Sequence, residues 1–317
     1  MTDEATKTGI WAARVSKWYG SVTALSDVSV HIEPGVWGLL GPNGSGKSTF
    51  LQLVAGLLRP NLGELRVNGE SPFDNPRVLQ TLGFAPEADA LYDDLTALEF
   101  VSGMAELHGI PRGEARDRAR AILTTLGLDG AQDRRLGTFS RGMRQRAKLA
   151  QALLHEPRVL LLDEPLTGTD PHSKQVILEE LRRRGQGGTL ILFSTHVLHE
   201  VEALTEQVIL IARGRLVAQG KTHEIRNLIH EHPHTIRVVC DRPRDLGSAM
   251  MATPSVVQVS FPEPRTVHFR TDDPEESYAA LQQSAVLAAH EIESITSPDA
   301  SLEALFHHLV ERAGSAS

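Results

Sequence analysis

The fold is decided by the stretch VWGLLGPNGSGKST at residues 36–49, in which a short apolar segment runs directly into a glycine-rich loop. Glycines in such a loop let consecutive backbone N–H groups curl around phosphate oxygens, and the helix that follows adds positive partial charge at its N-terminus. The Lys47 ammonium can reach terminal phosphates, and the Ser48 hydroxyl can ligate Mg²⁺. The candidate phosphate contacts are Gly41, Asn43, Gly44, Gly46, Lys47, Ser48 and Thr49.

A second apolar run, Val159–Leu162, ends in two adjacent carboxylates, Asp163 and Glu164. Open α/β sheets bind ligands at the carboxyl ends of their strands, so these carboxylates are expected near the phosphate-binding loop. We expect Asp163 to hold Mg²⁺ through water and Glu164 to polarise an attacking water as a general base. Beside a phosphate-binding loop, this interpretation outweighs the alternative of a solvated loop.

Apolar runs alternate with helical patterns through the first two thirds of the chain, which indicates an α/β fold with a buried parallel sheet. Residues 11–17 and 25–32 predict short strands before the glycine-rich loop. Behind the loop, the apolar spacing predicts a helix over residues 50–58, stopped by an Arg-Pro pair. Residues 97–127 predict a helical insert, which Gly109-Ile110-Pro111 divides in two.

The last third of the chain predicts a small separate domain. Its segments follow the order strand, helix, strand, strand, helix, strand, which matches the ferredoxin-like α+β unit. These segments are 235–240, 246–251, 256–260, 266–270, 274–288 and 291–296. Asp273 and Pro274 predict the start of the second helix, and a further apolar helix is expected over 302–310. The predicted domains are a cassette at 8–222 with its helical subdomain near 88–150, a linker at 223–233 and an accessory domain at 234–317.

The 317 residues, 41% hydrophobic and 23% charged, have the composition of a globular protein of about two domains. No uninterrupted apolar run exceeds five residues, whereas a membrane helix needs about 20. The acidic first residues lead into no apolar stretch, and the single cysteine, Cys240, cannot form an internal disulfide. We therefore expect a cytoplasmic protein, and the net charge of −8 argues against general affinity for nucleic acid.

Over about residues 11–220, these motifs resemble the nucleotide-binding subunits of ATP-binding cassette (ABC) transporters. Phe139-Ser140-Arg141-Gly142-Met143 resembles the signature motif of that family, although its third and fifth residues depart from the commonest form. The resemblance implies that Ser140 and Gly142 reach the γ-phosphate of ATP bound to the opposite subunit. A serine-capped helix N-terminus suits this role because it attracts anions.

Three further motifs support the resemblance. Thr195-His196 resembles the family's switch histidine, which contacts the γ-phosphate, and Gly168-Thr169-Asp170-Pro171 resembles the loop joining the two nucleotide sites across the dimer. Tyr19 stands where the family stacks an aromatic ring on adenine. Trp18 is its rival, but we expect a tryptophan in a β segment to lie in the core.

Glu87 occupies the position at which most members of the family have glutamine. By resemblance, this residue bridges Mg²⁺, the attacking water and the membrane partner. A carboxylate oxygen can still ligate Mg²⁺. Glutamate also occurs here in some exporter-type members, so Glu87 narrows the resemblance to that subfamily.

Two other residue clusters have weaker functional interpretations. His230, His232 and His234 alternate like zinc ligands, but Pro233 interrupts the pattern. The basic clusters at 141–148 and 182–184 could contact nucleic acid, but solvated helix faces are the stronger interpretation.

The resemblance implies an ATPase that uses ATP and Mg²⁺, forms a homodimer of cassettes around ATP and powers a separate transmembrane permease. That permease would hold the protein peripherally on the inner face of the cell membrane. The single cassette, Glu87 and the C-terminal domain resemble bacterial ABC-2-type exporter subunits, whose cargo is chosen by the permease. The alternatives are a soluble ABC ATPase of DNA repair or translation and a regulatory module without turnover, which Glu164 disfavours. We expect the accessory domain to regulate or dimerise.

Overall fold

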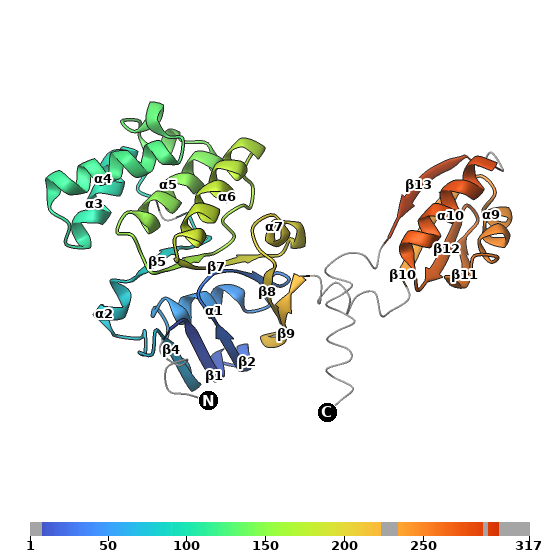
Figure 1. Ribbon diagram of the computed structural model, residues 1–317, viewed down its shortest axis with the longest axis horizontal. Coiled ribbons are helices and arrows are strands. Elements are labelled where there is room, and N and C mark those ends of the chain that lie inside the picture. The colour runs from blue at the N-terminus through green and yellow to red at the C-terminus, as the bar shows by residue number, and fades with distance from the viewer. Residues whose placement is uncertain (1–7, 90, 223–233, 288–290, 298–317) are drawn as a thin grey trace. The chain divides into compact units, whose positions relative to one another are not determined.

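The computed structural model describes residues 8–89, 91–222, 234–287 and 291–297 (Figure 1). The chain forms two compact units, residues 1–220 and 221–317, each described by itself below. The predicted linker, the predicted helix at 302–310 and two of the three alternating histidines, His230 and His232, lie outside the described residues. In the part of the chain that is described, no helix combines the length and the apolar character needed to cross a bilayer.

The first unit is built around a six-stranded sheet with the order β5-β6-β7-β3-β8-β9. These strands are β3 (Val36–Leu40), β5 (Leu82–Ala85), β6 (Val159–Leu162), β7 (Leu190–Thr195), β8 (Gln207–Ala212) and β9 (Arg215–Lys221). The pairs from β5 to β8 are parallel, and every residue of β6 and β7 is buried. Burial on both faces explains the continuous apolar runs. The predicted parallel α/β architecture is confirmed.

A second, antiparallel sheet with the order β2-β1-β4 shares a core with the helix after the glycine-rich loop. Its strands are β1 (Ile10–Tyr19), β2 (Val22–Ile32) and β4 (Leu62–Val67), and the helix is α1 (Lys47–Val54). Phe50 and Leu53 of α1 lie in this core. The first two strands are longer than predicted because their pairing continues to Tyr19 opposite Val22, on either side of the turn at Gly20-Ser21.

The helix α1 ends at Val54, so the predicted end at Leu58 is wrong. Gly56 has a φ of +71°, and the N–H of Leu57 donates to the carbonyl of Gln52 at 3.0 Å. A left-handed glycine followed by such a backward bond terminates helices. The glycine therefore ends α1, well before the proline does.

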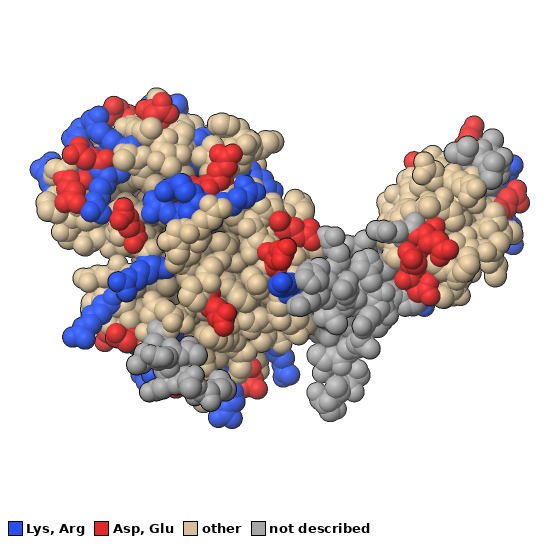
Figure 2. Space-filling model, viewed as in Figure 1, with Lys and Arg blue, Asp and Glu red and all other residues tan. Residues whose placement is uncertain are grey.

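The helical insert lies between β5 and β6 and consists of α3 (Ala97–Leu107), α4 (Arg112–Thr125) and α5 (Arg141–Leu153). Thr96 caps α3 in a capping box with Glu99. Gly109, with a φ of +84°, and Pro111 separate α3 from α4, as predicted. Acidic and basic side chains interleave over this part of the surface (Figure 2). The remaining helices of this unit are α2 (Pro76–Leu79), α6 (Pro171–Gln186) and α7 (Leu198–Glu202).

In its described residues, the second unit is a four-stranded antiparallel sheet with two helices. Its elements are β10 (His234–Cys240), α9 (Pro243–Met250), β11 (Val256–Glu263), β12 (Thr266–Thr271), α10 (Pro274–Leu287) and β13 (Ile292–Thr296). The strand order β11-β12-β10-β13 places the first and third strands in the centre, as the ferredoxin-like prediction requires. Cys240 is fully buried in its core, and the Asp273 carboxylate caps α10 by accepting from the N–H of Glu276.

Two histidines stack where the helical insert meets the parallel sheet. His108, at the end of α3, and His155, between α5 and β6, have ring centroids 3.9 Å apart at an interplanar angle of 9°. Nε2 of His155 lies 2.9 Å from the carbonyl oxygen of Leu82. Burial, reinforced by His108, lowers the pKa of His155 to about 4.

Because of this pair, we expect the protein to lose stability at acidic pH, and the substitution His155→Gln should reduce that loss. Because the folded pKa of His155 is depressed, the unfolded chain binds more protons between about pH 6.5 and pH 4, so stability falls as the pH drops through that range. His155 should account for about 1–2 kcal/mol of the loss between pH 7 and pH 5. Urea unfolding of both proteins at the two pH values measures this, and an equal loss in both would contradict it.

Candidate active site

The glycine-rich loop joins the end of β3 to α1 in a conformation that only glycines adopt easily. Gly44 and Gly46 have φ angles of +75° and +107°, and a Cβ at Gly46 would lie 2.6 Å from the carbonyl oxygen of Ala24. Lys47 is 6% exposed, and its Nζ donates to the carbonyl oxygens of Gly41 at 2.7 Å and Pro42 at 3.2 Å. The loop therefore curls back over the lysine and holds its ammonium with two carbonyl oxygens.

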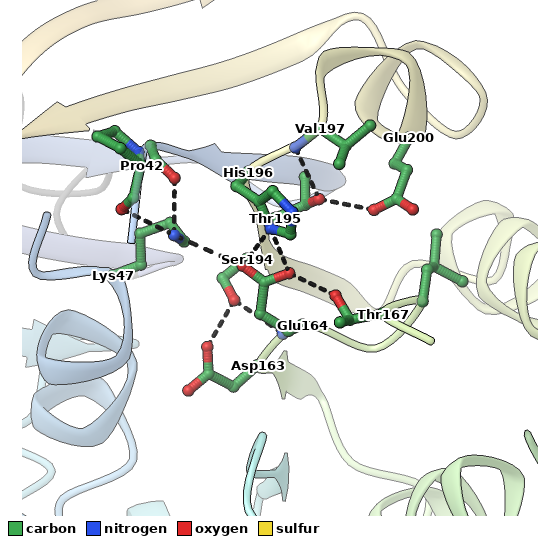
Figure 3. Close-up of polar contacts among 12 residues, drawn as sticks. Pro42, Lys47, Asp163, Glu164, Thr167, Ser194, Thr195, His196, Val197 and Glu200 are labelled. Atoms are coloured by element: carbon green, nitrogen blue, oxygen red, sulfur yellow. Dashed lines mark hydrogen bonds and ion pairs between the residues drawn. The ribbon is translucent and has the colours of Figure 1, made fainter. Parts of the chain in front are cut away.

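The two carboxylates after β6 lie beside the end of β7, because these strands are parallel neighbours (Figure 3). The hydroxyl of Ser194 donates to Oδ1 of Asp163 at 2.6 Å and accepts from the backbone N–H of Glu164 at 2.9 Å. Asp163 and Glu164 are both at least nine-tenths buried. Ser194 thus fixes the carboxylate of Asp163 and the backbone of Glu164.

Glu164 lies at the centre of the polar cluster in Figure 3. Its carboxylate accepts from the Thr167 hydroxyl at 2.7 Å, lies 3.5 Å from Nζ of Lys47 and 3.1 Å from Nδ1 of His196. Its φ of +50° is a left-handed conformation that costs a non-glycine residue about 1–2 kcal/mol. Strain of this kind persists where the surrounding contacts hold a residue in a functional orientation.

The structure brings together Lys47, Asp163, Glu164 and His196, which are far apart in the sequence. It also adds residues that the sequence analysis missed: Ser194, Thr167 and the buried Glu200. Glu200 accepts from the Thr195 hydroxyl at 2.6 Å and pairs with Lys174 at 2.9 Å, which anchors the segment before His196. Only Ser194 could have been found, because it extends the apolar run toward Thr195-His196.

The signature segment begins α5, as predicted, and the helix starts at Arg141, directly after Ser140. Ser140 caps it by accepting from the N–H of Met143. A Cβ at Gly142 would lie 2.5 Å from Oγ of Ser173, so the start of α5 packs closely on the start of α6. Hydrogen bonds from Ser173 lower the pKa of Asp170, which caps α6. Within the described residues, no hydrogen bond or ion pair joins Ser140 or Gly142 to Lys47 or Glu164.

Two other predicted site residues lie on the surface, outside this cluster. Glu87 is exposed in the loop after β5, and its carbonyl oxygen accepts from Nζ of Lys148 at 3.0 Å. Tyr19, at the end of β1, is 46% exposed, with Nζ of Lys17 5.5 Å from its ring centroid. Trp18 is 38% exposed, so its expected place in the core is wrong. It lies beside a register shift, two residues before the exposed turn that joins β1 to β2.

The residues present fit a nucleotide with Mg²⁺. The hydroxyl of Ser45 is buried in the glycine-rich loop without a hydrogen-bond partner among the described residues. Leaving such a group unpaired costs about 1–3 kcal/mol, which a phosphate oxygen would recover. Hydroxyl and carboxylate oxygens, which Ser48, Glu87 and Asp163 offer, are the ligands that Mg²⁺ prefers.

Comparisons with known proteins agree with this geometry. Residues 25–167 match the ABC transporter family. The daunorubicin/doxorubicin resistance ATP-binding protein DrrA of Streptomyces peucetius is 31% identical over 92% of this chain and 88% of its own length. The linearmycin resistance ATP-binding protein LnrL of Bacillus subtilis (strain 168) is 35% identical over 66% of this chain and 68% of its own length.

Solved structures of ABC transporter ATP-binding subunits and cassettes have the same fold over about two thirds of this chain. An ATP-binding subunit of an ABC transporter superposes with a TM-score of 0.64 at 30% identity, covering 69% of this chain and 92% of that one. The ABC transporter cassette MJ0796, in a dimeric post-hydrolysis state with ADP and Pi, superposes with a TM-score of 0.62 at 25% identity, covering 67% of this chain and 98% of that one. With its phosphate-binding loop, buried carboxylates and cassette fold, the chain belongs to the ATP-binding subunits of ABC transporters, which are ATPases.

Proposed function

We propose that this chain is the ATPase subunit of an exporter whose membrane-spanning permease is a separate protein. The observation that carries the proposal is the cluster of Lys47 and Glu164, both buried, with the more exposed His196 beside them at the carboxyl ends of neighbouring strands. The relatives named for drug resistance support the export direction. A soluble role in DNA repair or translation has no comparable observation in its favour.

Each residue of the cluster has a role set by its position. The loop N–H groups and Lys47 bind the β- and γ-phosphates, and Glu164 accepts the proton of the attacking water. Thr167 and His196 hold the carboxylate of Glu164, and His196 contacts the γ-phosphate. Ser48 and Asp163 would hold Mg²⁺, with the carboxylate of Glu87 as a further ligand, and the bound ion would neutralise charge on the phosphates.

The second half of each site comes from another cassette. Ser140 and Gly142 lie at a capped helix N-terminus, which favours an anion, yet they are not joined to Lys47 within one chain. A homodimer that places them on the γ-phosphate bound by the partner would complete the site. Tyr19 stacks on adenine in this arrangement. The accessory unit regulates or dimerises, and its sheet carries none of these nucleotide-binding residues.

The surface that receives the permease lies beside Glu87. A hollow of about 250 Å³ opens there between the segment after β5 and the helical insert, lined by Phe84, Pro86, Leu91, Tyr92, Phe100, Met104, Lys148 and Gln151. Its lining is mostly apolar, and Tyr92 is 61% exposed. A short helix of a membrane protein fits such a groove by inserting apolar side chains. The permease would thereby hold the chain on the inner face of the membrane.

A crosslinking experiment tests this partner. In a Cys240→Ala background, a cysteine replacing Tyr92 should crosslink in membranes to one protein that mass spectrometry identifies as having several membrane-spanning helices. A cysteine replacing Leu107, which is 81% exposed at the far end of α3, should not. Crosslinks found only to DNA-bound or ribosomal proteins, or equally at both positions, would refute the transporter assignment.

A further inference from the structure

Three polar side chains on one face of α5 hold the segment that carries Glu87. Arg144, Lys148 and Gln151 are spaced by four and three residues, so they share a face of the helix. All three point to the same stretch of chain, from the end of β5 into the loop beyond it. Ser140, at the N-terminus of the same helix, lies only two turns from Lys148.

The contacts follow the loop in order. Nε2 of Gln151 donates to the carbonyl oxygen of Phe84 at 2.8 Å. Nζ of Lys148 donates to the carbonyl oxygens of Pro86 and Glu87, both at 3.0 Å. These bonds fix the backbone at Phe84, Pro86 and Glu87, from the end of β5 into the loop.

Arg144 extends this set of contacts to the far side of Glu87. Its guanidinium pairs with Asp89, lies 2.7 Å from Oδ1 of Asp93 and donates to the carbonyl oxygen of Leu136 at 2.8 Å. The N–H of Gly137 also donates to the carbonyl oxygen of Asp93 at 3.1 Å. The loop after Glu87 is therefore tied to the segment that leads into Ser140.

Lys148 is the middle contact and the most deeply buried of the three, at 5% exposure. Burial lowers its pKa, whereas the carboxylates of Asp89 and Glu87 oppose that shift. An apolar residue of similar length would fill the same space but would leave the carbonyl oxygens of Pro86 and Glu87 without this donor. The ammonium therefore holds the loop backbone at Glu87 itself.

We propose that Lys148 is a positioning residue for Glu87, which fixes the loop backbone and offsets the charge that a glutamate brings to the Mg²⁺ site. This inference rests on the proposed role of Glu87. With Arg144 and Gln151, Lys148 makes α5 a stiff connection between that loop and Ser140.

The first test compares Lys148→Met and Lys148→Arg with Arg118→Met, a charge-removing control at an exposed position of α4. Lys148→Met should lower kcat for ATP about tenfold with KM little changed, at a temperature at which its melting curve shows it to be folded. Amide hydrogen exchange over residues 86–93 should become at least about tenfold faster without nucleotide. Lys148→Arg, which keeps the charge, should have nearly the kcat and the exchange rate of the unaltered protein. Unchanged exchange and kcat in Lys148→Met would overturn the proposal.

A double-mutant cycle with Glu87→Gln tests the charge. A neutral amide needs no cation beside it, so the kcat loss caused by Lys148→Met should shrink to about twofold in that background. Equal losses in both backgrounds would overturn charge compensation. If Glu87→Ala kept full kcat while the exchange rate in Lys148→Met still rose, the role of Glu87 at Mg²⁺ would fail and the positioning of the loop would stand.

Discussion

Replacing Glu164 with glutamine is expected to lower steady-state ATP hydrolysis by at least about 100-fold while ATP binding is retained. The amide keeps the size and the hydrogen bond with Thr167 but cannot accept the proton of the attacking water, and general-base catalysis contributes about 10²–10⁴-fold. Because ATP then persists in the site, the variant should accumulate as an ATP-bound dimer. Phosphate release and size-exclusion chromatography with ATP measure the two effects.

The matched control is Glu179→Gln, the same change at an exposed position of α6. It should hydrolyse ATP at the unaltered rate and remain monomeric under conditions that trap the Glu164 variant. Hydrolysis by Glu164→Gln at the rate of the unaltered protein would remove Glu164 from the catalytic role.

Replacing Lys47 with alanine is expected to weaken ATP binding by about 10–100-fold and to abolish turnover. Charge-assisted hydrogen bonds contribute about 1.5–3 kcal/mol, and Lys47 is a buried ammonium held by the glycine-rich loop. Its loss also leaves the buried Glu164 without the cation that lies 3.5 Å away. Fluorescent-nucleotide titration gives the affinity.

Two controls separate phosphate binding from folding. Arg118→Ala removes an exposed charge on α4 and should leave affinity unchanged. Lys47→Arg keeps the charge and should bind ATP better than the alanine variant, although its larger head group fits the loop poorly. A folded Lys47→Ala protein, judged by its melting temperature, that binds ATP with full affinity would contradict the assignment.

Local patterns predicted most of the fold. The glycine-rich loop, the break between α3 and α4 and the cap of α10 each depend on residues within a few positions of one another, so the sequence displays them directly. The ferredoxin-like order could be predicted for the same reason, because each strand and helix carries its own periodicity. The end of α1 was missed because the apolar spacing continues past Gly56, and backbone conformation outweighs it there.

The groups that we expect to carry the chemistry can be found in the sequence alone, because the glycine-rich loop, the carboxylates at a strand end and the serine that caps a helix each occupy one short stretch. The side chains that support these groups become visible only in the folded structure. Ser194 reaches Asp163 across 31 residues of chain, and Lys148 reaches Pro86 across 62. Such bonds form because parallel strands and a returning helix bring distant segments together, and no local pattern of spacing records which partners will meet.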